Sequence, residues 1–447
     1  MPAMHLSGSS APAGLDVDSE SHGDQAVGET GESAPETATM AGNPGCLEAV
    51  TALRNDILLH LTAIGVIATG DATRETVDSK DAIRTMHAHQ RAKKARQVRQ
   101  ALRPHWDRLL DHLADGHEVD PARIDPELAP MVSDQETGEL FRLATLLWSV
   151  PVSSGFGRRM RYLVRDRHNG KLIGVFALGD PVFNLRARDG WIGWNAEDRR
   201  QHLVHVMDAY VVGAVPPYAQ LLGGKLVMAL TGSTRVAADF AARYGETTGI
   251  ISQERKSAQL ALITVTSALG RSSLYNKLRL TAPPEDGEAP RTLANLRRLG
   301  TTEGYGHFQL SDELFGRVRS LLAREEHPYA DAHQFGQGPN RRFRVVRVGL
   351  KRLGLDPQIL KHGIAREVYA MALVGNPQEY FCGREAAVPL TLPSVADIAA
   401  AARQRWIVPR AERRPEYRAF RKNQLEDLSS LLDEEPEPGS RSEVPVP

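Results

Sequence analysis

The most specific chemistry in the sequence lies in a glycine-containing turn between a buried strand and a helix. Residues 211–215 are apolar enough for a buried strand, and Gln220, Gly223, Gly224 and Lys225 follow before a helical run. Backbone N–H groups at such a helix start, aided by the helix dipole and a lysine, suit a phosphate or pyrophosphate. The same glycines also permit close packing of a helix on a sheet, so both interpretations stay open.

A second group of residues combines arginines, acids and tryptophans. Guanidinium groups bind phosphates through paired hydrogen bonds, and indole rings stack on exposed bases. The alternative interpretations are a hydrophobic latch for the two tryptophans, and helix capping or arginine pairing for the acids. The residues expected to contact nucleic acid or substrate are Arg158, Arg159, Arg161, Asp180, Asn184, Arg188, Asp189, Trp191, Trp194 and Arg271.

No metal site is expected from the sequence. His202 and His205 lie three positions apart on a predicted helix, but no further ligand accompanies them at zinc spacing. Residues 300–306 resemble a nucleotide loop only superficially, because the Gly-Lys-Ser/Thr ending of a P-loop is missing.

Charge is distributed unevenly along the 447 residues, although 55 basic side chains balance 55 acidic ones. Residues 1–45 carry seven acids and no Lys or Arg, and residues 423–447 carry seven acids with Arg441 as their one base. Residues 46–422 therefore hold 54 bases and 41 acids, an excess of 13. A basic body of this kind favours a nucleic-acid partner, either DNA or RNA.

The cysteine count and the hydropathy pattern indicate a soluble cytoplasmic protein. Cys46 and Cys382 are the only cysteines, which excludes a disulfide scaffold or a thiolate zinc finger. The N-terminus lacks a basic segment followed by an apolar run, so no signal peptide is expected. The longest apolar stretch, residues 210–230, contains Pro216, Pro217 and Lys225, which argues against a membrane span.

Hydrophobic periodicity predicts helices in both flanks and strands in the middle. Helix-period residues occupy 47–67 and 79–102, and the basic second segment is either a solvated face or a phosphate-facing helix. Asn169-Gly170 between alternating apolar runs predicts a β-hairpin. The later elements expected are helix 197–206, strand 209–215, helix 223–244, strand 259–266, helix 272–280, loop 281–290, strand 304–309, a helix capped by Ser311, and mostly helix over 343–432.

This order predicts an α+β fold, in which a central mixed β-sheet with packed helices lies between helical N- and C-terminal flanks. The terminal acidic tails have few large apolar residues and are expected to be disordered. The segments expected are a tail over 1–45, a helical region with the basic helix over 46–147, a central domain over 148–342, a helical region over 343–422 and a tail over 423–447.

The central order of elements resembles the core of the GNAT acyltransferases. In that family a turn of pattern Gln/Arg-x-x-Gly-x-Gly/Ala holds the coenzyme A pyrophosphate, and here Lys225 stands at its last position. The resemblance implies that acetyl-CoA or a related acyl-CoA is bound by Gln220, Gly223, Gly224 and Lys225. It also implies catalytic roles for Tyr275, as the acid that protonates the thiolate, and Ser267. Tyr275 as a core aromatic is the alternative.

A second resemblance covers roughly residues 80–410. Residues 148–164, WSVPVSSGFGRRMRYLV, resemble the Druantia anti-phage protein DruA family, as do GDPVFNL at 179–185, TSALGRSS at 266–273 and GTTEGYGHF at 300–308. The family implies a bacterial defence component with relatives beside mobile elements. Our first hypothesis is an anti-phage protein that acts on or binds nucleic acid, with acyl transfer as its reaction if it is an enzyme. The alternative is a non-catalytic DNA- or RNA-binding adaptor or mobile-element accessory protein that works with other defence proteins, including a helicase.

Overall fold

A computed structural model describes residues 44–63, 79–131, 134–152, 155, 157–248, 255–282, 290–305, 310–327 and 339–425. Contacts divide the chain into two units, Met1–Ala49 and Val50–Pro447. The second unit contains every element below except the start of α1. The expected acidic tails fall outside the described residues, apart from a few positions at their inner ends.

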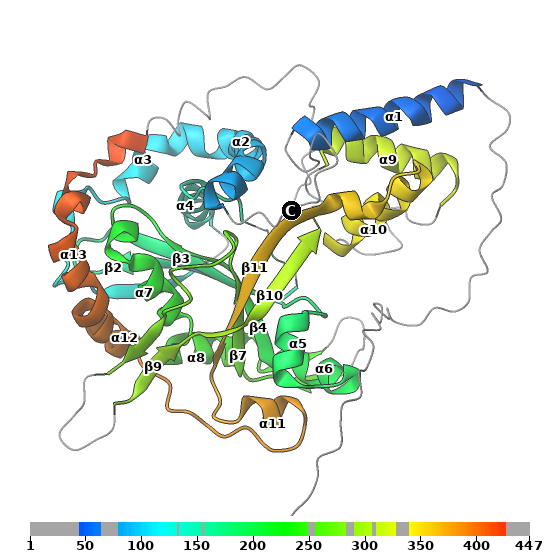
Figure 1. Ribbon diagram of the computed structural model, residues 1–447. Coiled ribbons are helices and arrows are strands. Elements are labelled where there is room, and N and C mark those ends of the chain that lie inside the picture. Colours follow the sequence, from blue (N-terminus) through cyan, green and yellow to red (C-terminus); the bar gives the residue numbers. More distant parts are fainter. Residues whose placement is uncertain are drawn as a thin grey trace, which may run out of the picture. The chain divides into compact units, whose positions relative to one another are not determined.

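A seven-stranded mixed sheet with the order β1-β2-β3-β4-β7-β11-β10 forms the centre of the second unit (Figure 1). Its neighbours pair antiparallel, except β4 and β7, which are parallel. This sheet with its packed helices confirms the predicted α+β class. Its strands are β1 (Pro126–Pro130), β2 (Arg159–Asp166), β3 (Leu172–Gly179), β4 (Val206–Ala214), β7 (Leu262–Thr266), β10 (Arg297–Tyr305) and β11 (Lys361–Ala372).

The parallel pair is short and has an irregular continuation. Val206 to Asp208 pair with Leu262 to Thr264, whereas β4 itself runs on to Ala214. Tyr210 is an extra residue in β4, since Ala209 and Val211 pair with consecutive residues of β3. Such a bulge bends its strand and re-aims the neighbouring side chains.

Helices cover both faces of the sheet because successive strand side chains alternate between faces. On one face, Met207, Ile263 and Tyr369 join a core with α7, α8 and α12. The opposite face carries two cores, one with α2 and α4 and one with α5 and α11. The helices of these layers are α2 (Lys80–Leu102), α3 (Trp106–Asp111), α4 (Gln135–Leu146), α5 (Arg186–Ile192), α6 (Ala196–His202), α7 (Gly223–Leu230), α8 (Thr234–Tyr244), α11 (Pro377–Phe381), α12 (Val395–Ala402) and α13 (Val408–Arg413).

Three further helices share a separate hydrophobic core. Its helices are α1 (Pro44–Ala63), α9 (Asp312–Arg324) and α10 (Pro339–Arg352). Ile57, Val318 and Leu350 are buried together in it. A Cβ at Gly349 would lie 2.2 Å from the Val318 side chain, so α9 and α10 approach each other at a position that needs glycine.

Several predicted elements are confirmed. The basic helix over 79–102 is α2, and the Asn169-Gly170 hairpin joins β2 to β3 with Gly170 at φ 73°. Ser311 caps α9, and its side chain accepts a hydrogen bond from the Leu314 N–H at 3.2 Å. The 47–67 helix corresponds to α1 as far as Ala63. Residues 64–67 and 306–309, and most of the loop over 281–290, lie outside the described residues.

Other expectations differ from the structure. The helix expected over 272–280 is instead a turn, in which the Ser272 hydroxyl accepts hydrogen bonds from the N–H groups of Leu274 and Tyr275, and β8 (Arg279–Thr281) follows it. β8 pairs with β9 (Thr292–Asn295). The helix expected over 223–244 is interrupted between α7 and α8. Gly232 lies at this break, where a Cβ would be 2.6 Å from the Met371 sulfur.

The strand β11 interrupts the run expected to be mostly helical. It lies between β7 and β10 in the sheet, so residues on both of its faces contact helices or neighbouring strands. Burial on both faces removes the alternation by which a strand is predicted. None of the described helices is long and apolar enough to cross a lipid bilayer.

Candidate nucleic-acid interface

The turn before α7 is filled by the protein's own side chains. Gly223 is buried, and a Cβ there would lie 2.7 Å from the Tyr218 carbonyl oxygen. A Cβ at Gly224 would lie 2.5 Å from the Leu274 side chain. These contacts match the interpretation in which both glycines permit close packing.

The two polar residues of the same turn, Gln220 and Lys225, contact residues of the C-terminal part of the chain. The Gln220 carbonyl oxygen accepts a hydrogen bond from Arg410 at 3.1 Å. The Lys225 ammonium lies 5.5 Å from the centre of the Trp406 ring, and burial lowers its pKa, with Arg405 adding to the shift. A pyrophosphate at this turn would therefore have to displace Leu274 and the Arg410 contact.

Tyr275 lies next to this turn, because Leu274 contacts Gly224. The Tyr275 ring stacks edge-on with Tyr369 at 5.7 Å, and burial raises its pKa, with the Asp208 carboxylate adding to the shift. Ser267 is buried beyond the end of β7, and its N–H donates to the Glu367 carbonyl oxygen at 2.8 Å. Tyr275 packs in the main core as a partly buried aromatic.

Arg158 and Asp180 form an ion pair inside the fold. The Arg158 Nε donates to Asp180 at 2.7 Å, and its other guanidinium nitrogens donate to the carbonyl oxygens of Val204 and Val206 at 2.8 and 3.4 Å. Gly157, at φ 62°, lets Asp180 come this close, since a Cβ there would be 2.0 Å from the carboxylate. Arg158 therefore joins β2 to the start of β4.

Asp189 is the centre of a second internal network. Its carboxylate accepts hydrogen bonds from Arg188 at 2.8 Å, from the Trp194 indole at 3.0 Å and from Arg199 at 3.3 Å. Arg188 is fully buried and also donates to the carbonyl oxygens of Val182 and Phe183. Burial lowers the pKa of Arg188, and the Asp189 carboxylate opposes that shift.

The tryptophans and the remaining predicted residues have different surroundings. Trp194 is buried and packs edge-on against Phe381, whereas Trp191 is half-buried below Arg297. The remaining residues divide by exposure: Arg159, Asn184 and Arg271 are exposed, and Arg161 is half-buried. The predicted group is thus divided between internal ion pairs and surface positions.

The inner face of α2 is apolar at both ends and polar in the middle. Ile83 at its start and Ala95, Val98 and Leu102 at its end are buried. Between them the inward positions are polar: His87, Gln90, Arg91 and Lys94. Spacings of three and four residues place these side chains on one face of the helix. The basic segment is therefore not simply a solvated face.

Basic residues from three other elements lie near this polar stretch. Arg142 of α4 and Arg161 of β2 lower the pKa of the Lys94 ammonium, after burial, which is the largest cause. Arg366 of β11 lowers the pKa of His87, again after burial. We call Arg91, Lys94, Arg142, Arg161 and Arg366 the α2 cationic cluster.

Four members of the cluster have no acidic partner among the described residues. Arg161 donates to the Tyr210 hydroxyl at 3.2 Å. Over the residues that the structure describes, Arg91, Lys94, Arg142 and Arg366 make neither an ion pair nor a side-chain hydrogen bond. The Nε atoms of Arg91 and Arg366 are buried without a partner, and burial alone lowers the pKa of Arg366. Uncompensated cations at partly buried positions favour binding of an anion.

Asp208 marks the point where the parallel pairing of β4 and β7 ends. The Thr264 hydroxyl donates to its carboxylate at 2.7 Å. Burial raises the pKa of Asp208 to about 6, while Thr264 and Arg188 oppose that shift. Within the described part of the chain, no group of three His, Cys, Asp or Glu side chains gathers as a metal site.

Sequence patterns identified only part of this cluster. The charge of α2 was visible as a run of bases without acids, and Arg161 belongs to the predicted arginine group. Arg142 and Arg366 had no distinguishing pattern, because they lie on an ordinary helix and on a strand whose sequence suggested helix.

The structure defines an α+β protein in which basic side chains of α4, β2 and β11 lie near the basic helix α2. The sequence profile of the family described as Druantia protein DruA matches residues 77–383. Druantia protein DruA of Escherichia coli (strain UMEA 4076-1) is 44% identical over 380 residues, which cover 85% of this chain and 92% of that protein. The chain belongs to the Druantia protein DruA family.

This membership confirms the resemblance drawn from residues 148–164 and the other shared strings. It also supports the coarser part of the functional hypothesis, a component of the Druantia anti-phage defence system. No solved structure matches the chain.

Proposed function

We propose that this DruA-family protein binds nucleic acid through the α2 cationic cluster. The supporting observation is the contrast between Arg91 or Arg366, which lack acidic partners among the described residues, and Arg158 or Arg188, which have them. A phosphate supplies the missing negative charge and accepts paired guanidinium hydrogen bonds. This is the adaptor hypothesis, in which the chain holds DNA or RNA for partner proteins, a helicase among them.

The test is the salt dependence of binding to labelled DNA and RNA oligonucleotides, measured by fluorescence anisotropy. Each phosphate contact that is lost lowers the slope of log affinity against log salt by about one. We expect Arg91→Gln/Lys94→Gln to lower that slope by about two and to weaken binding about tenfold or more at low salt.

The matched control is Arg96→Gln, an exposed arginine on the outer side of the same helix. We expect a change in slope well below that of the double variant. An unchanged slope in Arg91→Gln/Lys94→Gln would exclude the cluster as the phosphate-binding site.

Acyl transfer is the second candidate, and the strand arrangement supports it. Strand β4 of the parallel β4–β7 pair leads into the turn that carries the GNAT-like pattern, and Tyr275 lies close to that turn. Leu274 lies against Gly224, and Arg410 bonds the Gln220 carbonyl oxygen, so the cationic cluster has the stronger support. Acetyl-CoA in excess should raise the melting temperature if the turn opens to bind it, because a ligand of the native state stabilises that state.

A further inference from the structure

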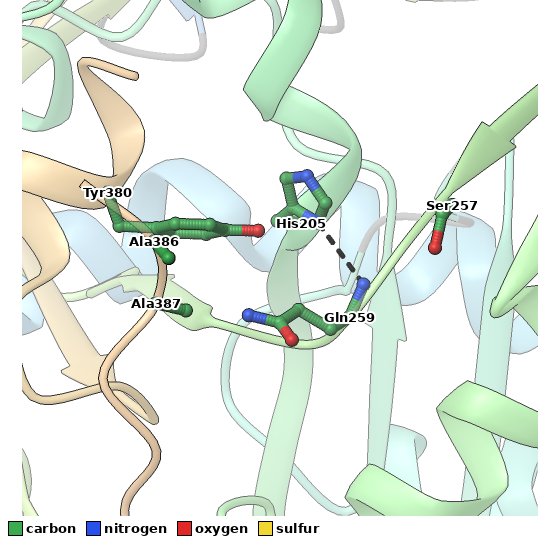
Figure 2. Close-up of a pocket in the computed structure, with 6 residues that line it drawn as sticks. All are labelled: His205, Ser257, Gln259, Tyr380, Ala386 and Ala387. Carbon is green, nitrogen blue, oxygen red and sulfur yellow. Dashed lines mark hydrogen bonds between the residues drawn. The ribbon is translucent and has the colours of Figure 1, made fainter. Parts of the chain in front are cut away.

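A small cavity lies beside helix α11 at the start of β4, whereas the α7 turn follows the end of that strand. Its volume is about 360 Å³, and its lining residues are His205, Ser257, Gln259, Tyr380, Ala386 and Ala387 (Figure 2). They come from the segment before β4, from β6 (Arg255–Ser257) and the linker after it, and from α11 and the loop after α11. The volume is at the lower end of the range for ligand pockets, about 300–1,000 Å³.

The cavity is lined by neutral groups at physiological pH. Burial lowers the pKa of His205 to about 4, and His202 and Arg158 add to the shift. The backbone N–H of Gln259 donates to the His205 Nδ1 at 3.1 Å, so the neutral ring carries its proton on Nε2. Among the described residues, no lysine, arginine, aspartate or glutamate lines the cavity, so none of them supplies a counter-charge for a phosphate or a carboxylate there.

The lining offers a flat apolar surface and a hydrogen-bonding edge. In Figure 2 the Tyr380 hydroxyl is directed toward His205. The Gln259 side chain opposes the rise in the pKa of Tyr380 that burial causes. The Gln259 carbonyl, the Ser257 hydroxyl and the His205 Nε2–H supply acceptors and donors, and Ala386 and Ala387 supply methyl groups.

The two internal ion-pair networks hold this cavity in place. Arg158 donates to the carbonyl oxygens of Val204 and Val206, which flank His205 in the chain. Trp194, fixed by Asp189, packs edge-on against Phe381 at 5.5 Å, and Phe381 follows Tyr380. His202 packs against Tyr380, with the two ring centres 5.7 Å apart, and its buried Nδ1 has no partner among the described residues.

We propose that this cavity binds one unpaired nucleobase. A base is planar and neutral, stacks on an aromatic ring, and presents donors and acceptors at its edge. The base is delivered either as a free nucleoside or within a single strand. Binding here is separate from phosphate binding at the α2 cationic cluster, because a nucleoside carries no phosphate.

The experiment has a nucleoside arm and a strand arm. In the first, saturation-transfer NMR is recorded with each of the four common nucleosides. In the second, the affinities of a mixed-sequence single strand and of an abasic strand of equal length are compared. The variants are Tyr380→Leu, which removes the stacking ring, and Gln259→Leu, at an exposed position where folding is not at risk.

We expect at least one nucleoside to bind, or the mixed-sequence strand to bind more tightly than the abasic strand. Each variant should weaken that base-dependent binding about tenfold, because it removes one stacking contact or one hydrogen bond to the base. Gln201→Leu is the matched control, since Gln201 lies on α6 outside the lining and bonds Glu197. Its binding should equal that of the wild type.

The outcomes separate the two sources and the two proposals. Nucleoside binding identifies a free nucleoside as a ligand, and base dependence confined to the strand identifies a nucleic-acid base. The cavity proposal is overturned if neither arm detects base-dependent binding, or if both variants bind as the wild type does. Failure of phosphate binding appears instead as loss of binding to both strands, while the nucleoside arm still decides the cavity.

Discussion

Two sets of arginines in this protein differ in what surrounds them. Arg158 and Arg188 each contact a carboxylate and backbone carbonyl oxygens, so their charge is used within the fold. Arg91 and Arg366 are partly buried and, among the described residues, have no such partner. Whether an arginine is available to bind a ligand therefore depends on the acids beside it in the fold, and not on the sequence motif in which it occurs.

The two sets should also have opposite effects on stability. A buried arginine with its carboxylate is costly to separate, because the remaining charge is left without a partner. An unpaired arginine at a partly buried site carries a desolvation cost that no protein group offsets. Removal of an arginine that is paired with a carboxylate should therefore destabilise the fold, whereas removal of an unpaired arginine should not.

The largest effect is expected for Arg188→Met. This variant leaves Asp189 with fewer donors and frees the carbonyl oxygens of Val182 and Phe183. We expect the free energy of unfolding in urea to fall by about 3–5 kcal/mol, as for other broken buried ion pairs.

The control for this variant is Arg159→Met, at an exposed position. Its effect should stay within about 0.5 kcal/mol. A loss below about 1 kcal/mol in Arg188→Met would mean that the Asp189 network is not needed for stability.

The variant Asp208→Asn tests how a buried carboxylate, rather than a buried arginine, affects stability. The folded pKa of Asp208, about 6, lies above the ordinary aspartate value of 3.8, so the protonated form is favoured in the native state. Its stabilising contribution is complete below pH 4 and is lost as the pH rises through 6. Above pH 7 we expect the variant to be more stable than the wild type by on the order of 3 kcal/mol.

The measurement is the free energy of unfolding of both proteins between pH 4 and 8. The difference between them should grow with pH and then level off. A constant difference over this range would show that Asp208 does not titrate with a raised pKa.

The smallest effects are expected for the two tryptophans. Trp194→Phe loses the hydrogen bond to Asp189 and should cost about 1 kcal/mol. Trp191→Phe should be nearly neutral, since its buried indole N–H has no partner among the described residues. Thermal unfolding of both variants checks this order, and a larger loss for Trp191→Phe would contradict it.

Local patterns predicted much of the fold. Asn169-Gly170 identified the β2–β3 hairpin, and Ser311 identified the start of α9, because both depend on neighbouring residues alone. β11 could not be predicted in this way. Its pairing with β7 and β10 joins segments far apart in the chain, and helices cover its outer surfaces.

The site was less predictable than the fold. The acids that neutralise Arg158 and Arg188 were among the predicted residues, but their pairing depends on the close approach allowed by Gly157 and on the turn into α5. Arg366 could not be identified because it lies near His87 of α2, which is far away in the sequence. Spacing along the chain contains no information about such a contact.

Phosphate binding by the α2 cationic cluster is tested most directly by the variant Arg366→Met. The measurement is thermal unfolding of wild type and variant, each with and without a saturating single-stranded oligonucleotide. We predict that the free variant is at least as stable as the wild type and that most of the stabilisation by the oligonucleotide is lost. A free variant as destabilised as Arg188→Met, with oligonucleotide stabilisation unchanged, would contradict the account.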